Sequence, residues 1–419
     1  LCRCPLSRAS SPLHIIAPSS ASPDSSPVVA AVDLGAIRHN AQKLQACADG
    51  ADLMAIIKAD AYGHGMLPVA RALTTAGIRH FGVARLAEGI RLREHGHTAR
   101  ILVLGAPAPA QLPQYAEHDL DATVPSPAVA AAVAKHAETG APLRVQVLVD
   151  TGMGRLGLAP EAASEVLRRL RTTPGVTVAG LWTHFATADS AFAQTQLERF
   201  EAVAAKHADD VQHIHAANTG ALLTLGPAPA SVSPTLVRSG IALYGLAATP
   251  ELAAQLDLRP AMQLTARVTQ LKTVPADTPI SYGATWTAPP RTSIATLGVG
   301  YGDGYPRLGS GRASVCIRGY TRPVVGTICM DMCMVDLGPP DRAPATHVSR
   351  GDPAVLFGPS GPSVYEVARW SETIPYEICC KVSPRVPRRY TAARPPSEAP
   401  VVSPSEQHTT SLRLQDSPH

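Results

Sequence analysis

Residues 53–65 read LMAIIKADAYGHG, an apolar run that passes directly into a polar turn punctuated by glycine. The run from Leu53 to Ile57 has the length and apolar character of a fully buried strand. Lys58 follows it immediately, so the sequence predicts an amine at the carboxyl end of a strand. A lysine in such a place most often extends along the surface into solvent. The rest of the chain decides whether this lysine has a function instead.

Between Leu53 and about Gly245, short apolar runs alternate with amphipathic stretches such as PEAASEVLRRL at 160–170. This alternation is typical of repeated strand–helix units around a parallel sheet. Eight strand candidates suggest closure into a (β/α)8 barrel of the TIM type, for which we expect the range 28–258. The candidates are 53–57, 80–83, 100–104, 120–124, 143–149, 176–183, 211–216 and 235–238.

The pattern changes from Arg259 onward, where period-two stretches such as MQLTARVTQL at 262–271 alternate with proline and glycine turns. We therefore predict an α/β chain whose barrel is followed by a C-terminal, mainly-β domain over 259–392. The glycine cluster GVGYGDG at 298–304 lacks the G-x-G-x-x-G spacing, and no helix pattern follows it. It is therefore not expected to bind a dinucleotide.

The two ends of the chain differ from the body in composition. Residues 1–27 are rich in Ser, Pro and Ala, carry two Arg against one acid, and lack the apolar core of a secretory signal. This composition fits part of an organellar transit peptide or an ordinary disordered extension, and both interpretations stay open. We accordingly expect a cytoplasmic protein, or a plastid or mitochondrial one if the extension is a transit peptide. Residues 393–419 are predicted to be a disordered tail.

Overall composition favours a small-molecule enzyme. The net charge is only +4 over 419 residues and aromatics make up 4%, which argues against a nucleic-acid groove or a basic membrane surface. No apolar run approaches the roughly 18 residues that cross a bilayer. The eight cysteines are scattered, so we expect reduced thiols and no disulfide framework. No cysteine or histidine pairs recur at zinc-site spacing, so no metal site is expected.

Polar residues follow the predicted strands one after another, at the end where (β/α)8 barrels place catalytic groups. Phosphate sites in such barrels favour the loops after strands seven and eight. Here those loops are 218–220 and 239–241, whose small residues would let backbone N–H groups approach a phosphate. The polar residues are Lys58, Asp150, Arg155, His184, Asn218, Thr219 and Arg238.

The motif KADAYGHG at 58–65 resembles the pyridoxal-phosphate lysine motif of alanine racemases. Seven further segments resemble the same family in the same order, and together they cover roughly residues 28–390. They are DTGMGRLG (150–157), WTHFATAD (182–189), ANTG (217–220), RSGIALYGL (238–246), SYGATW (281–286), LGVGYGDGYPR (297–307) and VGTICMDMCM (325–334).

The resemblance implies an enzyme that binds pyridoxal 5'-phosphate as a Schiff base on Lys58. Arg155 would contact the ring hydroxyl and Arg238 the pyridine nitrogen. Because arginine only donates hydrogen bonds and keeps its proton, it leaves that nitrogen unprotonated, which weakens the electron sink and favours reprotonation. The remaining cofactor-binding residues implied by the resemblance are Tyr62, His184, Asn218, Thr219, Gly240 and Ile241.

Racemisation requires a base on each face of the planar intermediate, because one group returning a proton to one face regenerates the starting enantiomer. The resemblance implies that Lys58 and Tyr282 are these bases for L- and D-alanine. A free tyrosine, with a pKa of about 10, is a poor base at neutral pH, and His184 beside Arg238 could help to ionise it. The resemblance further implies a homodimer in which one subunit supplies the other with Tyr282 and with residues that contact substrate, as Arg155 also does. These are Tyr301, Met330 and Asp331.

Two positions depart from the family pattern. Leu148 stands where many members carry a carbamylated lysine, so no charge there can orient Arg155, and Pro384 replaces a tyrosine often found before RVP. Two alternative functions share part of this pattern. A decarboxylase of the same architecture would need an acid facing the pyridine nitrogen, against Arg238 and Tyr282. A non-catalytic pyridoxal-phosphate binding protein would not need the motifs of the β domain.

Overall fold

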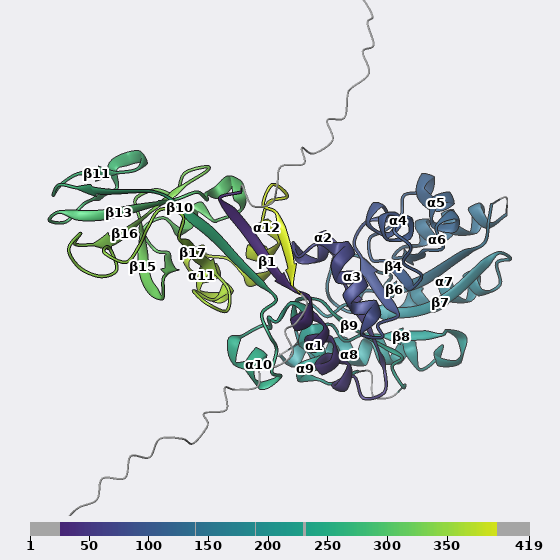
Figure 1. Ribbon diagram of the computed structural model, residues 1–419. Helices are drawn as coiled ribbons and strands as arrows, with labels where there is room; N and C mark the ends of the chain where they lie inside the picture. Colours follow the sequence, from purple (N-terminus) through teal and green to yellow (C-terminus); the bar gives the residue numbers. More distant parts are fainter. Residues whose placement is uncertain (1–25, 139, 189, 229–231, 392–419) are drawn as a thin grey trace, which may run out of the picture.

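The computed structural model of the protein describes residues 26–138, 140–188, 190–228 and 232–391. The expectations for the two ends of the chain fall mostly on residues 1–25 and 392–419, which lie outside this range, and they stay predictions. The described residues form two lobes, with strand β1 (Val28–Asp33) and strand β10 (Met262–Val274) running between them (Figure 1). No helix among the described residues is both long and apolar enough to cross a membrane.

One lobe is the predicted parallel barrel. Eight parallel strands pair in the order β8-β7-β6-β5-β4-β3-β2-β9. The two outer strands meet through backbone bonds from Thr235 N–H to Ile214 O (3.1 Å) and from Arg238 N–H to Ala217 O (3.0 Å). Each strand overlaps a strand candidate of the sequence, so the prediction of a (β/α)8 fold is confirmed. The strands are β2 (Asp52–Ile56), β3 (His80–Val83), β4 (Arg100–Val103), β5 (Asp121–Val124), β6 (Leu143–Val149), β7 (Val176–Thr183), β8 (His213–His215) and β9 (Leu236–Ser239).

Amphipathic helices surround this sheet. Helix α7 (Pro160–Arg171) illustrates why they form: Pro160 opens the first turn, Glu161 follows it, and arginines fill the last turn, as the helix dipole favours. Its apolar residues recur at helical spacing and are buried against the strands. The other helices of the lobe are α1 (Leu34–Ala46), α2 (Lys58–Tyr62), α3 (Met66–Thr75), α4 (Leu86–Glu94), α5 (Leu112–Glu117), α6 (Pro127–Ala137), α8 (Ala191–Ala204), α9 (Thr219–Thr224) and α10 (Pro250–Gln255), with short 3-10 turns η2 (Pro109–Gln111), η3 (Ala208–Asp210) and η4 (Ile241–Tyr244).

The second lobe is mainly β, as predicted. Its strands pair in the order β13-β16-β15-β14-β17-β10-β1-β18, and an additional β10–β13 pairing closes the sheet on itself. The strands not yet given bounds are β13 (Thr292–Leu297), β14 (Ser314–Ile317), β15 (Tyr320–Val325), β16 (Cys333–Gly338), β17 (Pro353–Phe357), β18 (Arg388–Thr391) and the small pair β11 (Pro279–Ile280) and β12 (Trp286–Thr287); the helical segments are η5 (Tyr282–Ala284), η6 (Tyr301–Asp303), η7 (Arg307–Gly309), α11 (Val364–Trp370) and α12 (Pro375–Lys381).

Strand β1 belongs to the second lobe although it lies within the range 28–258 expected for the barrel. It pairs antiparallel with β10 and parallel with β18. Its sequence VVAAVD buries alternate residues, as a half-covered strand does, but alternation cannot indicate which sheet the strand joins. The described part of the chain thus begins in the β domain before α1 enters the barrel lobe.

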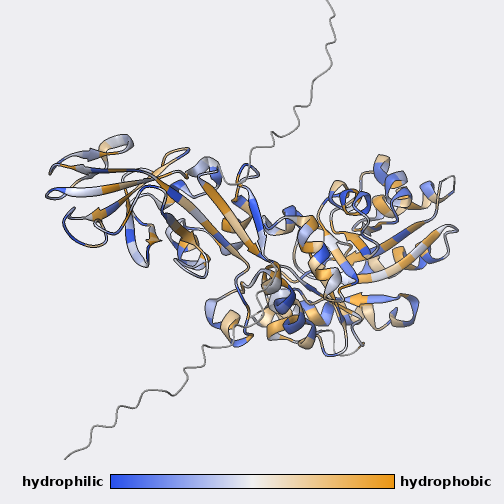
Figure 2. Cartoon of the chain, in the orientation of Figure 1, coloured by the Kyte–Doolittle hydropathy of each residue, from blue (hydrophilic) through white to orange (hydrophobic). Residues whose placement is uncertain are grey.

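A single hydrophobic core continues through both lobes, and Figure 2 shows hydrophobic residues along the strands of each. A second, smaller cluster lies in the β domain around Ile280 and Ile294. Ile280 ends strand β11, two residues before Tyr282, at the end of the β domain away from the barrel (Figure 1).

Candidate active site

Lys58 opens a turn with unusual backbone geometry. After strand β2, the residues from Ala59 to Tyr62 all have positive φ, between 52° and 55°, so α2 is a left-handed turn. Left-handed geometry costs a residue with a Cβ roughly 1–2 kcal/mol. Strain of this kind persists only where the surrounding structure maintains it, and it clusters at functional sites.

Hydrogen bonds from both sides hold the turn in place. Ala59 N–H donates to Glu88 Oε1 at 2.7 Å, and Asp60 Oδ1 accepts from Met66 N–H at 2.9 Å. Gly63 ends the turn with φ +80, and a Cβ there would lie 2.2 Å from the carbonyl oxygen of Cys379. A glycine is therefore required where helix α12 meets the turn.

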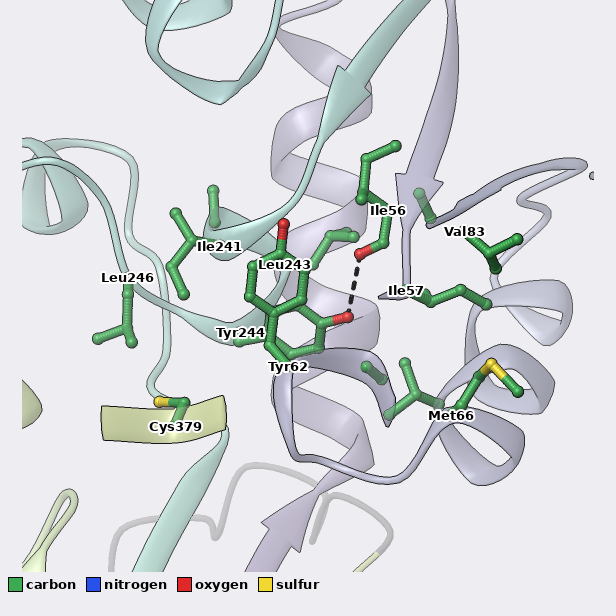
Figure 3. Close-up of a cluster of buried hydrophobic side chains, with 14 of the residues drawn as sticks. Ile56, Ile57, Tyr62, Met66, Val83, Ile241, Leu243, Tyr244, Leu246 and Cys379 are labelled. Atoms are coloured by element: carbon green, nitrogen blue, oxygen red, sulfur yellow. Dashed lines mark hydrogen bonds between the residues drawn. The ribbon is translucent and has the colours of Figure 1, made fainter. Parts of the chain in front are cut away.

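Tyr244 packs against the turn, and Figure 3 shows its ring beside that of Tyr62. The Tyr244 ring lies 4.4 Å from the ring of His64 and 5.0 Å from that of Tyr62, and its hydroxyl donates to Ile56 O at 3.1 Å. Burial lowers the pKa of His64 to about 4, so this histidine is neutral and donates from Nδ1 to Tyr62 O at 2.9 Å. The turn thus packs against buried, uncharged side chains.

The turn borders a cavity of about 520 Å³ at the carboxyl ends of the barrel strands. All nine residues expected to bind the cofactor line it, although they come from five different strand ends and loops. They are Lys58, Tyr62, Arg155, His184, Asn218, Thr219, Arg238, Gly240 and Ile241. The barrel topology brings together residues that are almost two hundred positions apart, as the positions of the predicted strands implied.

The environment of Lys58 favours the neutral amine. Burial lowers the pKa of Lys58, and the positive charge of Arg155 lowers it further. His184 is uncharged at neutral pH, because burial and then the charge of Arg238 lower its pKa to about 3. The cavity therefore combines fixed cations with an amine that releases its proton more readily than an exposed lysine does.

Arg238 lies at the bottom of the cavity, almost fully buried. Its Nη1 donates to His215 Nδ1 (2.7 Å) and His215 O (3.1 Å), and its Nη2 to Thr183 O (2.6 Å) and Ala216 O (2.8 Å). Burial lowers the pKa of Arg238 to about 9, which still leaves it protonated at neutral pH. No described residue accepts a hydrogen bond from its Nε–H, so that donor is left for a ligand.

The two loops expected to bind a phosphate pack against each other. Thr219 Oγ1 lies 3.1 Å from Ser239 Oγ and accepts from Gly240 N–H at 3.1 Å. A Cβ on Gly240 would lie 2.4 Å from the hydroxyl oxygen of Tyr62, so only glycine lets this hydroxyl reach the loop. Asn218 begins helix α9 by accepting from Ala221 N–H at 3.0 Å.

Asp150 shapes the loop that carries Arg155. Its Oδ1 accepts from the backbone N–H of Gly152 (2.9 Å) and Met153 (2.8 Å). Leu148 also lines the cavity and contributes an apolar wall, so nothing charged stands there beside Arg155.

Tyr376 and Cys380 also line the cavity, and sequence reasoning named neither of them as a site residue. They lie four residues apart on one face of helix α12, and the Tyr376 ring is 6.1 Å from that of Tyr62. Helical spacing in PYEICC could have paired them, but no local signal places α12 over the barrel. Tyr376 therefore adds to the cavity a tyrosine that the sequence analysis did not predict, although Pro384 occupies the position where the family often has one.

The remaining four predicted residues gather elsewhere, on the β domain. Tyr301 N–H donates to Cys329 O (3.0 Å). Arg385 joins the segment that holds Tyr301 to the segment that holds Met330 and Asp331, because it donates to Asp303 Oδ1 and Asp331 Oδ1, each at 2.8 Å. The side chain of Tyr282 is 74% exposed, that of Met330 53% and that of Tyr301 43%. In the described part of the chain, the residues that line the cavity do not include Tyr282, Tyr301, Met330 or Asp331.

Comparison with known proteins shows to which family the chain belongs. The model of the alanine racemase N-terminal domain matches residues 32–248, and that of the C-terminal domain matches residues 261–390. The chain belongs to the alanine racemase family. The alanine racemase of Chlorobaculum tepidum is 42% identical over 369 residues, covering 86% of this chain and 94% of the relative. That of Symbiobacterium thermophilum is 42% identical over 374 residues, covering 87% and 97%.

Solved structures agree with this assignment. Alanine racemase from Streptomyces coelicolor matches with a TM-score of 0.81 and 37% identity, covering 87% of this chain and 98% of that one. The Bacillus anthracis enzyme, at 32% identity with a TM-score of 0.78, was solved with bound L-Ala-P and covers 87% of this chain and 95% of its own. The chain is thus an isomerase that interconverts L- and D-alanine with pyridoxal 5'-phosphate.

The alanine racemase cavity fits this cofactor. It offers the amine of Lys58 at one end, the free Nε–H of Arg238 at the other, and a glycine-bearing pair of loops at the side. A strand-end lysine, a buried cation and small-residue loops suit an aldehyde, a ring nitrogen and a phosphate respectively. Among the described residues, no group of three or more His, Cys, Asp or Glu could hold a metal ion.

Proposed function

We propose that this alanine racemase acts as a head-to-tail homodimer in which the β domain of one copy completes the cavity of the other. One observation carries the proposal: Tyr282, Tyr301, Met330 and Asp331 face solvent on the β domain, and none lines the cavity of its own chain. The cavity rim also exposes Leu156 at 39%. Apolar and aromatic groups exposed on both surfaces are typical of surfaces that meet a partner.

On the barrel side, each residue has a proposed role in holding the cofactor. Lys58 carries it, Arg155 contacts its ring hydroxyl, and Arg238 donates its Nε–H to the ring nitrogen. Pyridoxal phosphate, when bound, supplies an electron sink for the charge that develops at Cα of alanine. Because Arg238 stays protonated, it donates to the ring nitrogen without transferring a proton to it, which limits the strength of that sink. The phosphate is assigned to Tyr62, Asn218, Thr219, Gly240 and Ile241, with His184 against the ring.

Two bases then exchange the proton at Cα from opposite faces. Lys58 serves one face, and its lowered pKa supports this role because a neutral amine can accept a proton. Tyr282 of the second copy serves the other face. On its own chain the phenol is exposed, whereas inside the cavity the charges of Arg155 and Arg238 would favour the phenolate. Tyr301, Met330 and Asp331 would complete the substrate pocket from the same side.

Mixing two inactive variants tests the shared site. Lys58→Ala and Tyr282→Phe subunits, allowed to exchange, form hybrid dimers with one doubly defective site and one intact site. Half of the dimers in an equal mixture are hybrids, so roughly a quarter of wild-type activity should return.

A second mixture is the matched control. Lys58→Ala with Arg155→Ala places both defects on barrels, so every site of a hybrid lacks one residue and activity should not return. If subunit exchange is verified by mass and the first mixture also stays inactive, both bases belong to one chain and the proposal fails.

A further inference from the structure

We infer that Asp121 and Gln146, in the interior of the barrel, are positioning residues that fix the proton on His215 and thereby hold Arg238 in its orientation. The inference rests on the proposed function, because Arg238 matters to catalysis only if it contacts the cofactor ring. Asp121 and Gln146 do not line the cavity, and the racemase chemistry described above assigns them nothing.

A continuous chain of hydrogen bonds runs from Asp121 to the cavity. Gln146 Nε2 lies 2.8 Å from Asp121 Oδ2, Gln146 Oε1 lies 2.8 Å from His215 Nε2, and His215 Nδ1 lies 2.7 Å from Arg238 Nη1. All four side chains are at most 3% exposed and come from strands β5, β6, β8 and β9. The chain therefore crosses the barrel interior with no water-exposed member.

The chemistry of the two ends determines every proton between them. A carboxylate only accepts, so the Gln146 atom that faces Asp121 is its amide nitrogen, and its oxygen faces His215. That oxygen requires a proton on His215 Nε2, which leaves Nδ1 as a lone pair. The lone pair faces Arg238, which only donates. A neutral His215 protonated at Nε2 is the single state that satisfies all three contacts.

The barrel is built to allow this chain. Gln146 on β6 reaches His215 on β8 by passing over Gly180 on β7, where a Cβ would lie 2.8 Å from Gln146 Oε1. Asp121 is held in turn by Arg100 Nη2 at 2.7 Å and Arg144 Nε at 3.3 Å, and these two contacts fix the direction of its carboxylate.

Other contacts fix the plane of the His215 ring. Its ring stacks on Trp182 with centroids 5.7 Å apart and planes within 5°, and Arg238 lies over the same indole at 5.0 Å. Burial, and then the charge of Arg238, lowers the pKa of His215 well below its usual value, in agreement with a neutral ring. If the proton moved to Nδ1, two donors would face each other and Arg238 would have to turn, which would move its Nε–H.

Nitrogen NMR of the holoenzyme labelled with 15N-histidine tests the tautomer directly. We expect the His215 signals, assigned by their loss in His215→Gln, to report a neutral ring protonated at Nε2 from pH 8 to pH 6. A ring protonated at Nδ1, or at both nitrogens at pH 6, would overturn the inference.

Three variants connect the tautomer to catalysis. Gln146→Met keeps the volume but removes the acceptor, and Gly180→Ala inserts a methyl group without removing any polar group. Both should alter the His215 signals and lower kcat about tenfold, a usual scale for removing the partner that orients a functional residue. Thr123→Val is the matched control, because it deletes a buried barrel hydrogen bond to Val103 O that does not belong to the chain of hydrogen bonds from Asp121 to Arg238.

The outcomes separate the inference from the proposed function. Equal kcat losses in all three variants, or unchanged His215 signals in Gln146→Met, would refute the positioning role. Altered signals with unchanged kcat and unchanged absorbance of the bound cofactor would instead uphold the hydrogen-bond chain and refute the contact between Arg238 and the cofactor ring.

Discussion

The two halves of the predicted site contrast in how they are held. On the barrel, residues from five loops and strand ends converge on one cavity, and Arg238 alone makes four buried hydrogen bonds. On the β domain, Tyr282, Tyr301 and Met330 project into solvent. The contrast shows that one chain brings its cavity residues together completely, whereas Tyr282, Tyr301 and Met330 are not among the described residues that line this cavity.

The energetics of the two halves differ accordingly. Arg385 links the β-domain loops through ion pairs but is itself 47% exposed, and exposed pairs contribute only about 0–1 kcal/mol. Buried hydrogen bonds to a charged group contribute more, about 1.5–3 kcal/mol each. The barrel half is therefore held by stronger contacts within the chain than the β-domain half is.

The largest effect is expected from Lys58→Ala, which removes the residue proposed both to anchor the cofactor and to act as one base. Racemase activity should fall by about 10³ or more, since loss of one positioned acid or base alone costs about 10²–10⁴. The absorbance of protein-bound pyridoxal phosphate should disappear after gel filtration. Lys135→Ala, at an exposed position of helix α6, serves as the control and should keep both properties. Retention of the absorbance band in Lys58→Ala would contradict the anchor.

A fall in pH should lower the free energy of unfolding through the buried His64, which lies beside the turn after Lys58. His64 has a native pKa of about 4, below the usual 6.5, so between these values the unfolded chain binds more protons than the folded one. The free energy of unfolding should therefore fall as the pH drops from 6.5 to 4. The shift corresponds to a contribution on the order of 3 kcal/mol at neutral pH.

A variant isolates this contribution. His64→Gln should show a flatter dependence of the unfolding free energy on pH between 6.5 and 4, measured by denaturant titration at several pH values. His95→Gln, at an exposed position on the same lobe, should keep the wild-type slope. An unchanged slope in His64→Gln would mean that other groups cause the acid sensitivity.

Tyr282→Phe tests the β-domain half. If Tyr282 takes the proton from L-alanine, the variant keeps Lys58 able to take it from D-alanine but cannot complete racemisation. Net racemisation should fall by about 10². In deuterated water, mass spectrometry should detect faster Cα exchange in D-alanine than in L-alanine. Tyr320→Phe, in a hairpin of the same domain, is the control. Equal loss of exchange from both enantiomers would indicate that Tyr282 only shapes the pocket.

The smallest effect concerns the strained turn after Lys58. Ala59 is exposed with φ +52, so Ala59→Gly should leave the stability unchanged or raise it by about 1 kcal/mol, because glycine adopts this conformation freely. Ala131→Gly, at an exposed position of the right-handed helix α6, should lose about 1 kcal/mol instead. Thermal unfolding of both variants distinguishes the cases, and equal losses would mean that the left-handed turn carries no strain.

Much of the fold was available from the sequence because apolar periodicity is local. Each barrel strand overlaps a predicted run, and Lys58 and Arg238 lie at the strand ends where the sequence indicated them. Since catalytic groups in (β/α)8 barrels lie at one end of the sheet, the order of strands along the chain was enough to predict that these residues meet. The motifs of the β domain could be located in the same way, but not the surface on which they gather.

Tertiary structure alone decided the features that depend on distant partners. The alternation in β1 is satisfied by either sheet, and only pairing with β10 and β18 assigns it to the β domain. The left-handed turn at Ala59 is disfavoured by its own residues and exists because Glu88, Met66 and helix α12 hold it. The proton on His215 is likewise set by a carboxylate on another strand. A sequence records the preference of each segment, whereas contacts between segments decide the outcome wherever that preference is weak or opposed.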